Sequence, residues 1–188
     1  MGLYTAFAEV SASIVSLLRD TVSPEPLTKP EQIGICSPKE RGNYTVGVFL
    51  YHIEMEKTMQ LQGRIQLDTE QYKEPPLAFS LYYMIFVHLD ADMNTKCVDE
   101  QRILGKIIQQ LYNYRKIPQN YLQGSLKAEQ LSLEYINISL EDKNKLYSLL
   151  NHSYETACFY KISPVLLDTE MVYRTKPVKE AQFQLHVK

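Results

Sequence analysis

An acidic loop holds the residues whose spacing most nearly fits a metal site. Asp90, Asp92 and Asn94 offer side-chain oxygens at the first, third and fifth positions of a calcium-binding loop. The sixth position should be Gly but is Thr95, and the twelfth should be Glu but is Gln101. A strand rather than a helix is expected before the loop. We therefore interpret it as a strand-to-helix connection that caps the next helix, and we predict no metal site.

Nucleophilic catalysis has weak support in this sequence. The three cysteines are odd in number, widely spaced and without a C-x-x-C pair: Cys36, Cys97 and Cys158. This pattern predicts free thiols rather than a disulfide framework or a zinc ribbon. Each cysteine lies in or beside an apolar segment, which is typical of a small buried side chain rather than a nucleophile.

The remaining catalytic and cofactor motifs are missing. The best cluster of titratable groups, His88 with Asp90 and Asp92, lacks the spacing of a metal site or a catalytic triad. The seven glycines form neither a dinucleotide-binding nor a P-loop motif, and no G-x-S-x-G elbow is present. We predict a non-enzymatic protein with no catalytic residues and no cofactor.

Net charge and hydropathy disfavour two further classes, nucleic-acid-binding proteins and membrane-spanning proteins. The 188 residues suit one domain, and 20 basic against 22 acidic residues leave a net charge of −2. Such a balance disfavours nucleic-acid binding. The longest apolar stretch, Leu77 to Leu89, is too short to cross a bilayer as a helix, and the first residues do not form a signal peptide. The sequence predicts a soluble cytoplasmic protein without membrane insertion.

Hydrophobic periodicity predicts alternating helices and strands. Helical spacing covers residues 4–20, 98–116 and 139–150, and strand-like patterns cover 33–36, 44–55, 77–89, 131–138 and 154–167. The strand at 44–55 is apolar on both faces, which predicts a central strand covered on both sides. Pro164 suggests an edge or a bend in the last strand. We predict an α/β (α+β) fold, with a central mixed sheet flanked by helices, over residues 1–170.

Two segments lie outside this predicted core. Residues 56–74 are polar but carry alternating apolar side chains, which predicts a small hairpin or extended arm. These side chains are Met59, Leu61, Ile65 and Leu67. Residues 171–188 are expected to form a C-terminal extended arm, in which Phe183, Leu185 and Val187 alternate with polar residues.

Aromatic residues point to contact surfaces without naming a partner. The chain has 14 Tyr and 6 Phe but no Trp, and most tyrosines lie inside predicted strands and helices. Core and subunit contacts are the simplest roles for them. The alternative is a module that binds a peptide or small ligand on an aromatic sheet surface.

The order of several short segments carries a family resemblance. These segments are Leu17-Leu18-Arg19-Asp20, Ser37-Pro38, Phe49 to Glu54, Pro75-Pro76-Leu77, Leu81-Tyr82-Tyr83, Glu100 to Gly105, Leu140 to Leu150 and Tyr154 to Pro164. Over roughly residues 3–170 the chain resembles the N-terminal domain of the cap, or tail-terminator, proteins of contractile injection systems. These systems are phage-tail-like particles of the antifeeding-prophage type. Where that family often has an Arg-Leu-Ser-type element, this chain has Glu155-Thr156-Ala157.

The resemblance implies a structural role. A homo-hexameric ring would end the tube and sheath distal to the baseplate, in a particle assembled in the cytoplasm, with the sheath protein and the inner tube protein as partners. We expect Phe183, Leu185 and Val187 to pair with the edge of a sheath subunit or a neighbouring cap subunit. An edge strand of the chain's own sheet is the simpler alternative. The 56–74 arm would contact the last tube ring, or else pack on its own domain.

Overall fold

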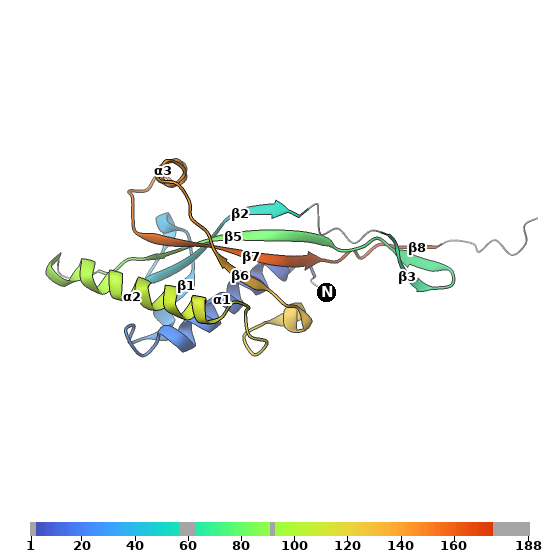
Figure 1. Ribbon diagram of the computed structural model, residues 1–188, viewed down its shortest axis with the longest axis horizontal. Helices are drawn as coiled ribbons and strands as arrows, with labels where there is room; N and C mark the ends of the chain where they lie inside the picture. Colours follow the sequence, from blue (N-terminus) through green and yellow to red (C-terminus); the bar gives the residue numbers. More distant parts are fainter. Residues whose placement is uncertain (1–2, 57–62, 91–92, 175–188) are drawn as a thin grey trace, which may run out of the picture.

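The computed structural model describes residues 3–56, 63–90 and 93–174, and it contains helices and strands in alternation (Figure 1). The helices are α1 (Ala6–Val22), α2 (Met93–Asn113) and α3 (Leu140–Leu149), with 3-10 turns η1 (Pro30–Gln32), η2 (Pro38–Glu40) and η4 (Gly124–Ala128). The strands are β1 (Ile33–Ile35), β2 (Val46–Met55), β3 (Ile65–Asp68), β4 (Gln71–Lys73), β5 (Leu77–Val87), β6 (Ser132–Tyr135), β7 (Ala157–Leu167) and β8 (Val172–Arg174).

The main sheet has five strands in the order β1-β2-β5-β7-β6. Only β1 and β2 run parallel, and the other neighbours are antiparallel, so the predicted mixed sheet is confirmed. β5 occupies the centre. Its side chains alternate between a large core, which takes Leu81, Tyr83 and Ile85, and a smaller core, which takes Met84 and Phe86. A second sheet has the order β3-β4-β8.

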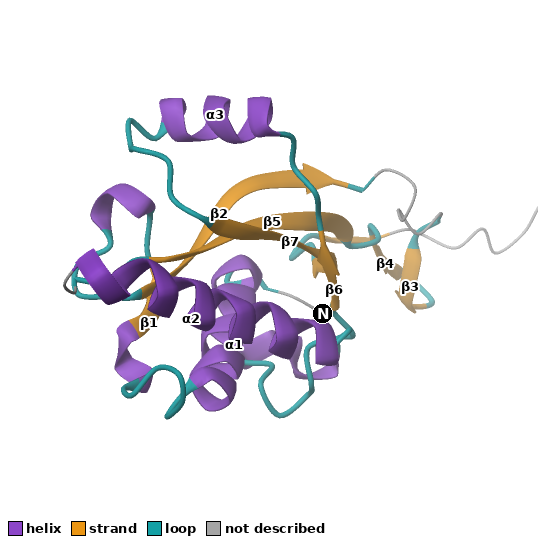
Figure 2. Ribbon diagram, turned by 60° about the vertical axis from the view of Figure 1, so that its left-hand side comes forward, coloured by secondary structure: helices purple, strands orange, loops and turns teal. Residues whose placement is uncertain are grey.

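Helices cover the two faces of the sheet unequally. α1 and α2 lie together on one face, whereas α3 lies alone on the other (Figure 2). α1 forms where the sequence predicts a helix, because Val10, Ile14, Leu17 and Leu18 make one apolar stripe that is fully buried. Burial of each such side chain stabilises the fold by roughly 2 kcal/mol relative to exposure.

The small core depends on α3. Ser139 caps this helix, since its Oγ accepts a hydrogen bond from the N–H of Asp142 at 3.1 Å. Tyr147 of α3 then packs with Phe159 of β7 against the central strand. Its hydroxyl donates to the Glu155 carbonyl at 2.6 Å.

The prediction for residues 44–55 is wrong in its second half. β2 pairs with β1 only as far as Val48, but with β5 along its length to Met55. Its last residues are exposed, and Ile53 and Met55 each keep 41% of their surface in solvent. The start of β2 is buried on both faces, because Val48 enters the large core and Phe49 packs on the small one. β5 is therefore the central strand.

The helix expected at 98–116 is displaced toward the N-terminus. α2 begins at Met93, where no apolar periodicity marks a start, and it ends at Asn113. The chain leaves the helix to run beside β6: the N–H of Leu133 donates to the Arg115 carbonyl at 2.9 Å, and that of Ile117 donates to the Leu131 carbonyl at 3.0 Å. Arg115 and Lys116 thus follow the helix instead of completing its last turn.

A carboxylate ties α1 to η4. Glu9 accepts hydrogen bonds from the N–H and the hydroxyl of Ser125, at 2.9 and 2.6 Å, and from Thr5 Oγ1 at 2.6 Å. Gly124 precedes this contact with a φ of +56°, and a Cβ there would collide with the Glu9 carboxylate. Burial alone would raise the pKa of Glu9, but the hydrogen bonds from Ser125 and Thr5 outweigh it and hold the pKa below its ordinary 4.5.

Glu9→Gln is expected to lower the free energy of unfolding by about 1 to 2 kcal/mol at pH 7, because hydrogen bonds to a charged acceptor are lost. A depressed pKa stabilises the fold above the ordinary pKa, and that stabilisation disappears as the pH falls through the lowered value. Denaturant unfolding of both proteins at pH 7 and pH 3 measures the difference. An equal difference at the two pH values would contradict this account of Glu9.

Candidate assembly interface

An ion pair with an arginine side chain holds the start of the acidic loop in this structure. Arg41 donates to the Asp90 carboxylate at 3.1 Å, and this hydrogen bond holds the pKa of Asp90 below its usual range. Asp92 lies outside the described residues. Within 3–56, 63–90 and 93–174, no three His, Cys, Asp or Glu side chains gather as a metal site would require.

His88 is part of a contact between β5 and the segment before β7. Its Nδ1 lies 2.7 Å from Glu155 Oε1, and its Nε2 lies 3.5 Å from Asp90. The second oxygen of Glu155 is buried without a hydrogen-bond partner among the described residues. Glu155 thus joins the segment before β7 to the end of β5.

The thiols differ in exposure. Burial raises the pKa of Cys36 to about 11, against the opposing effect of Arg41, and raises that of Cys158 to about 12. Both are therefore protonated at neutral pH and unsuited to nucleophilic attack. Cys97 is exposed, contrary to the expectation that each cysteine is a buried apolar side chain.

The first open edge of the main sheet belongs to β2. β1 is short, and within the described chain no strand pairs with the outer side of β2 after Val48. The uncovered part carries two half-exposed apolar side chains, Ile53 and Met55. On the opposite face Tyr82 donates to Glu54 at 2.6 Å. A strand edge with one apolar and one polar face is a template for another chain.

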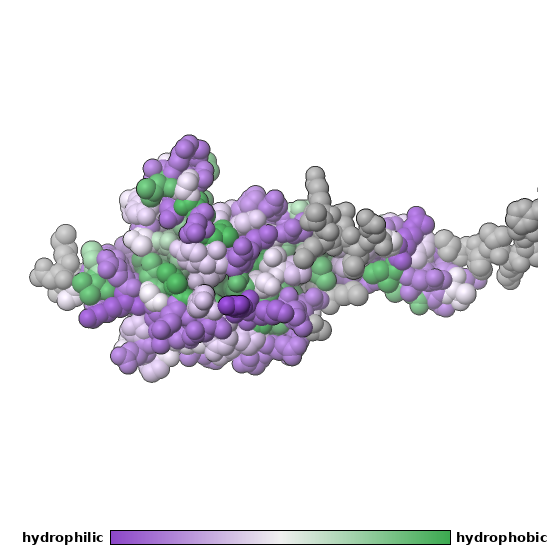
Figure 3. All heavy atoms as spheres, in the orientation of Figure 1, coloured by the Kyte–Doolittle hydropathy of each residue, from purple (hydrophilic) through white to green (hydrophobic). Residues whose placement is uncertain are grey.

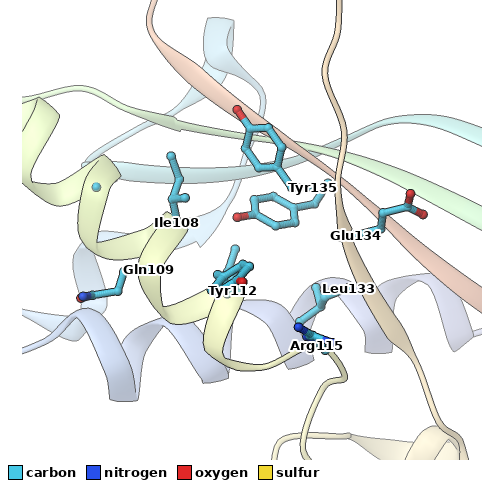
Figure 4. Close-up of a pocket in the computed structure, with 10 residues that line it drawn as sticks. Ile108, Gln109, Tyr112, Arg115, Leu133, Glu134 and Tyr135 are labelled. Atoms are coloured by element: carbon cyan, nitrogen blue, oxygen red, sulfur yellow. The ribbon is translucent and has the colours of Figure 1, made fainter.

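Among the described residues, the outer side of β6 beyond Leu133 forms the second open edge, and it adjoins a groove of about 600 Å³. Figure 4 shows Ile108 and Tyr112 of α2 on one side of the groove, with Leu133 and Tyr135 of β6 on the other. The side chain of Glu134 points away from it. An apolar patch follows α2 where the helix borders the sheet, framed by polar residues (Figure 3).

A three-stranded arm extends the molecule along its long axis (Figure 1). It continues from the start of β5 and the end of β7. Tyr72 stacks on Tyr173 with ring centroids 5.2 Å apart, and the Arg64 guanidinium lies 4.4 Å above the Tyr72 ring. At the base, Lys73 pairs with Asp168 at 2.7 Å while both side chains are largely buried.

The bend expected near Pro164 lies where this arm departs. β7 is an interior strand of the sheet, but β6 pairs with it only up to Ser163. The β5–β7 register shifts between the pairs Leu81–Ile162 and Phe79–Val165. Two residues of β7 thus oppose Ser80, which bends the strand as a bulge does.

The structure confirms the predicted hairpin for the described part of the 56–74 segment. Ile65 is half-buried and Leu67 is 49% exposed on β3. Met59 and Leu61 lie outside the described residues, as do all three apolar residues predicted for C-terminal strand pairing: Phe183, Leu185 and Val187. β8 lies in the segment that the sequence predicts to be extended, but the sequence did not reveal its pairing with β4. The proposed division at residue 170 stays a prediction.

Lys73→Met is expected to loosen the arm, because it leaves Asp168 without its cation in a poorly hydrated site. Amide hydrogen exchange in β4 and β8 should become faster, while exchange in β5 stays unchanged. Lys145→Met is the matched control, since it removes an exposed pair with Glu141 at 2.7 Å. Unaltered exchange in the arm of the Lys73 variant would contradict this role.

These surfaces define an α+β domain whose open features are two sheet edges, a groove and an arm. No helix in the described ranges is long and apolar enough to cross a membrane. The sequence model of the family described as the Pvc16 N-terminal domain matches residues 9–180, and the chain belongs to this family. No curated protein matches the chain in sequence.

Two solved structures share the fold. One is a cryo-EM structure of an extracellular contractile injection system, the PVC sheath/tube terminator in its extended state, with a TM-score of 0.66 and 13% identity. The other is the anti-feeding prophage cap, described as the AFP tube terminating cap, with a TM-score of 0.62 and 12% identity. The matches cover 96% and 94% of this chain but only 63% and 60% of those chains.

Proposed function

We propose that this chain is a structural cap, or tail terminator, of a contractile injection system. It forms a ring that ends tube and sheath polymerisation at the end distal to the baseplate. The observation that carries the proposal is the fold shared with the sheath/tube terminator over 96% of the chain, together with the family match over residues 9–180. A polymer end exposes the contacts that the next ring would use, so a terminator must bury them and present none onward.

The ring is proposed to be a homo-hexamer, as the sequence resemblance implies. A cyclic ring needs two different surfaces on each subunit, one of which meets the other on the neighbour. The edge of β6 can serve as one of these surfaces, because within the described residues no strand pairs with its outer side. Mass measurement of the purified protein tests it: six copies are expected, and a protein that stays monomeric at assembly concentrations would contradict it.

The arm is proposed to contact the inner tube. It projects from the body, and Leu67 presents a half-exposed apolar side chain on β3 (Figure 1). Met59, Leu61 and Ile65 complete the apolar set that the sequence places in this segment. Burial of such side chains against the last tube ring would remove their surface from water.

Replacing Leu61 and Leu67 with Asp is expected to abolish binding to purified tubes, because carboxylates would enter an apolar contact. Co-sedimentation with tubes measures the loss, and the mass of the variant shows whether the ring still forms. Gln66→Asp is the control, since it adds charge at the exposed position of β3 between Ile65 and Leu67. Full tube binding by an intact ring of the double variant would refute the tube contact.

The C-terminal segment is proposed to add a strand to a sheath subunit or a neighbouring cap subunit. Truncation after Glu180 should therefore abolish sheath capping, visible as sheaths of uncontrolled length. Replacing Phe183, Leu185 and Val187 with Ser should reproduce the defect, whereas Ser at Gln184 and His186 should not, because only the first set forms the apolar face. Normal capping and ring formation by the truncated chain would end this proposal.

A further inference from the structure

The flank of α2 that faces β6 is open to solvent. Ile108 of α2 packs against the core but is only half-buried, and Tyr112, one turn further along the helix, keeps 72% of its surface exposed. A Cβ added to Gly105 would meet nothing within 4 Å, so the helix flank is open at that point too. The space between this flank and β6 is the groove of about 600 Å³, and its size and apolar walls suit the side chains of one further strand.

The backbone of β6 is available on the same side. Outward groups of the strand bond to the chain after α2 only as far as Leu133. The N–H of Ile136 turns inward and donates to the Phe159 carbonyl at 2.9 Å. By the alternation of an antiparallel ladder, the N–H and carbonyl of Tyr135 point outward. In the described part of the chain no strand pairs with that side.

We propose that the C-terminal segment of a neighbouring copy, residues 183–187, occupies this groove as an added strand beside β6. Its apolar residues would face α2. The polar residues Gln184 and His186, with Lys188 beyond them, would lie on the face toward which Glu134 points. The apolar alternation therefore matches the groove, and the polar face of the added strand would lie on the side of the Glu134 carboxylate. This inference rests on the proposed ring and names its subunit contact.

The length of the segment suits a contact between copies. Fourteen residues follow Arg174 (188 − 174), which at about 3.3 Å per residue in an extended chain reach roughly 46 Å. In a closed ring each copy would insert its C-terminal segment into the groove of one neighbour and bind the segment of the other neighbour. Every segment would then be bound and every groove filled. The cap would then present no open β6 edge to a further ring, as a terminator requires.

Cross-linking between two differently tagged chains tests the contact. Both carry Cys97→Ser to remove the exposed thiol; one also carries Tyr112→Cys and the other Leu185→Cys. A short thiol–thiol reagent should join the two chains within assembled rings. Ile53→Cys, at the β2 edge, replaces Tyr112→Cys as the control and should give no cross-link. A cross-link between Ile53→Cys and Leu185→Cys would overturn the inference. A third chain carries both Tyr112→Cys and Leu185→Cys, and a cross-link that forms only within this chain would overturn it too.

A charge in the groove gives a second readout. Tyr112→Asp should raise the protein concentration at which rings form by at least tenfold. The thermal unfolding of the monomer should stay unchanged. Leu149→Asp is the control, because this residue is 85% exposed on α3, on the other face of the sheet. Rings that form and cap sheaths with no cross-link would refute only this contact. Failure of the unmodified chain to form rings would refute the proposed function itself.

Discussion

The β5–β7 ladder is the interaction on which the other features of the structure depend. It runs antiparallel from the pair Leu77–Leu167 to the pair Phe86–Ala157, and β5 sends alternate side chains into both cores. α1 and α2 close one core and α3 closes the other. The arm is built on the same two strands past the bulge at Ser80, so its position is fixed by the ladder. A rigid centre thereby holds several open surfaces in fixed relative positions.

Those surfaces contrast with the closed interior. An exposed strand edge is a liability in a protein that works alone, because it invites pairing with any other edge. Within the described residues two edges remain open, at β2 and β6, and each is bordered by exposed apolar side chains, Ile53 and Tyr112 among them. A subunit that must join others can use such edges, since pairing satisfies their backbone groups and buries the apolar residues. The geometry is consistent with the cap proposed for this family member.

The sequence predicts helices and strands that have a local hydrophobic periodicity. It does not predict features that depend on pairing between distant segments. The helical spacings at residues 4–20 and 139–150 are local signals, and both are confirmed by α1 and α3. The pattern of β2 reports two apolar faces but not the number of neighbouring strands, so its exposed end was missed. β8 is short and exists through its pairing with β4, and the groove needs α2 and β6 to meet. The proposed ring rests only on family resemblance, because no residue pattern in this chain indicates a number of subunits.

The proposed cap is expected to end both the tube and the sheath. Electron microscopy of particles from cells that lack the chain, compared with complemented cells, tests it most directly. We expect tubes or sheaths of uncontrolled length, or particles that fall apart, and normal particles after complementation. Particles of normal length with intact ends in the absence of the chain would contradict the account.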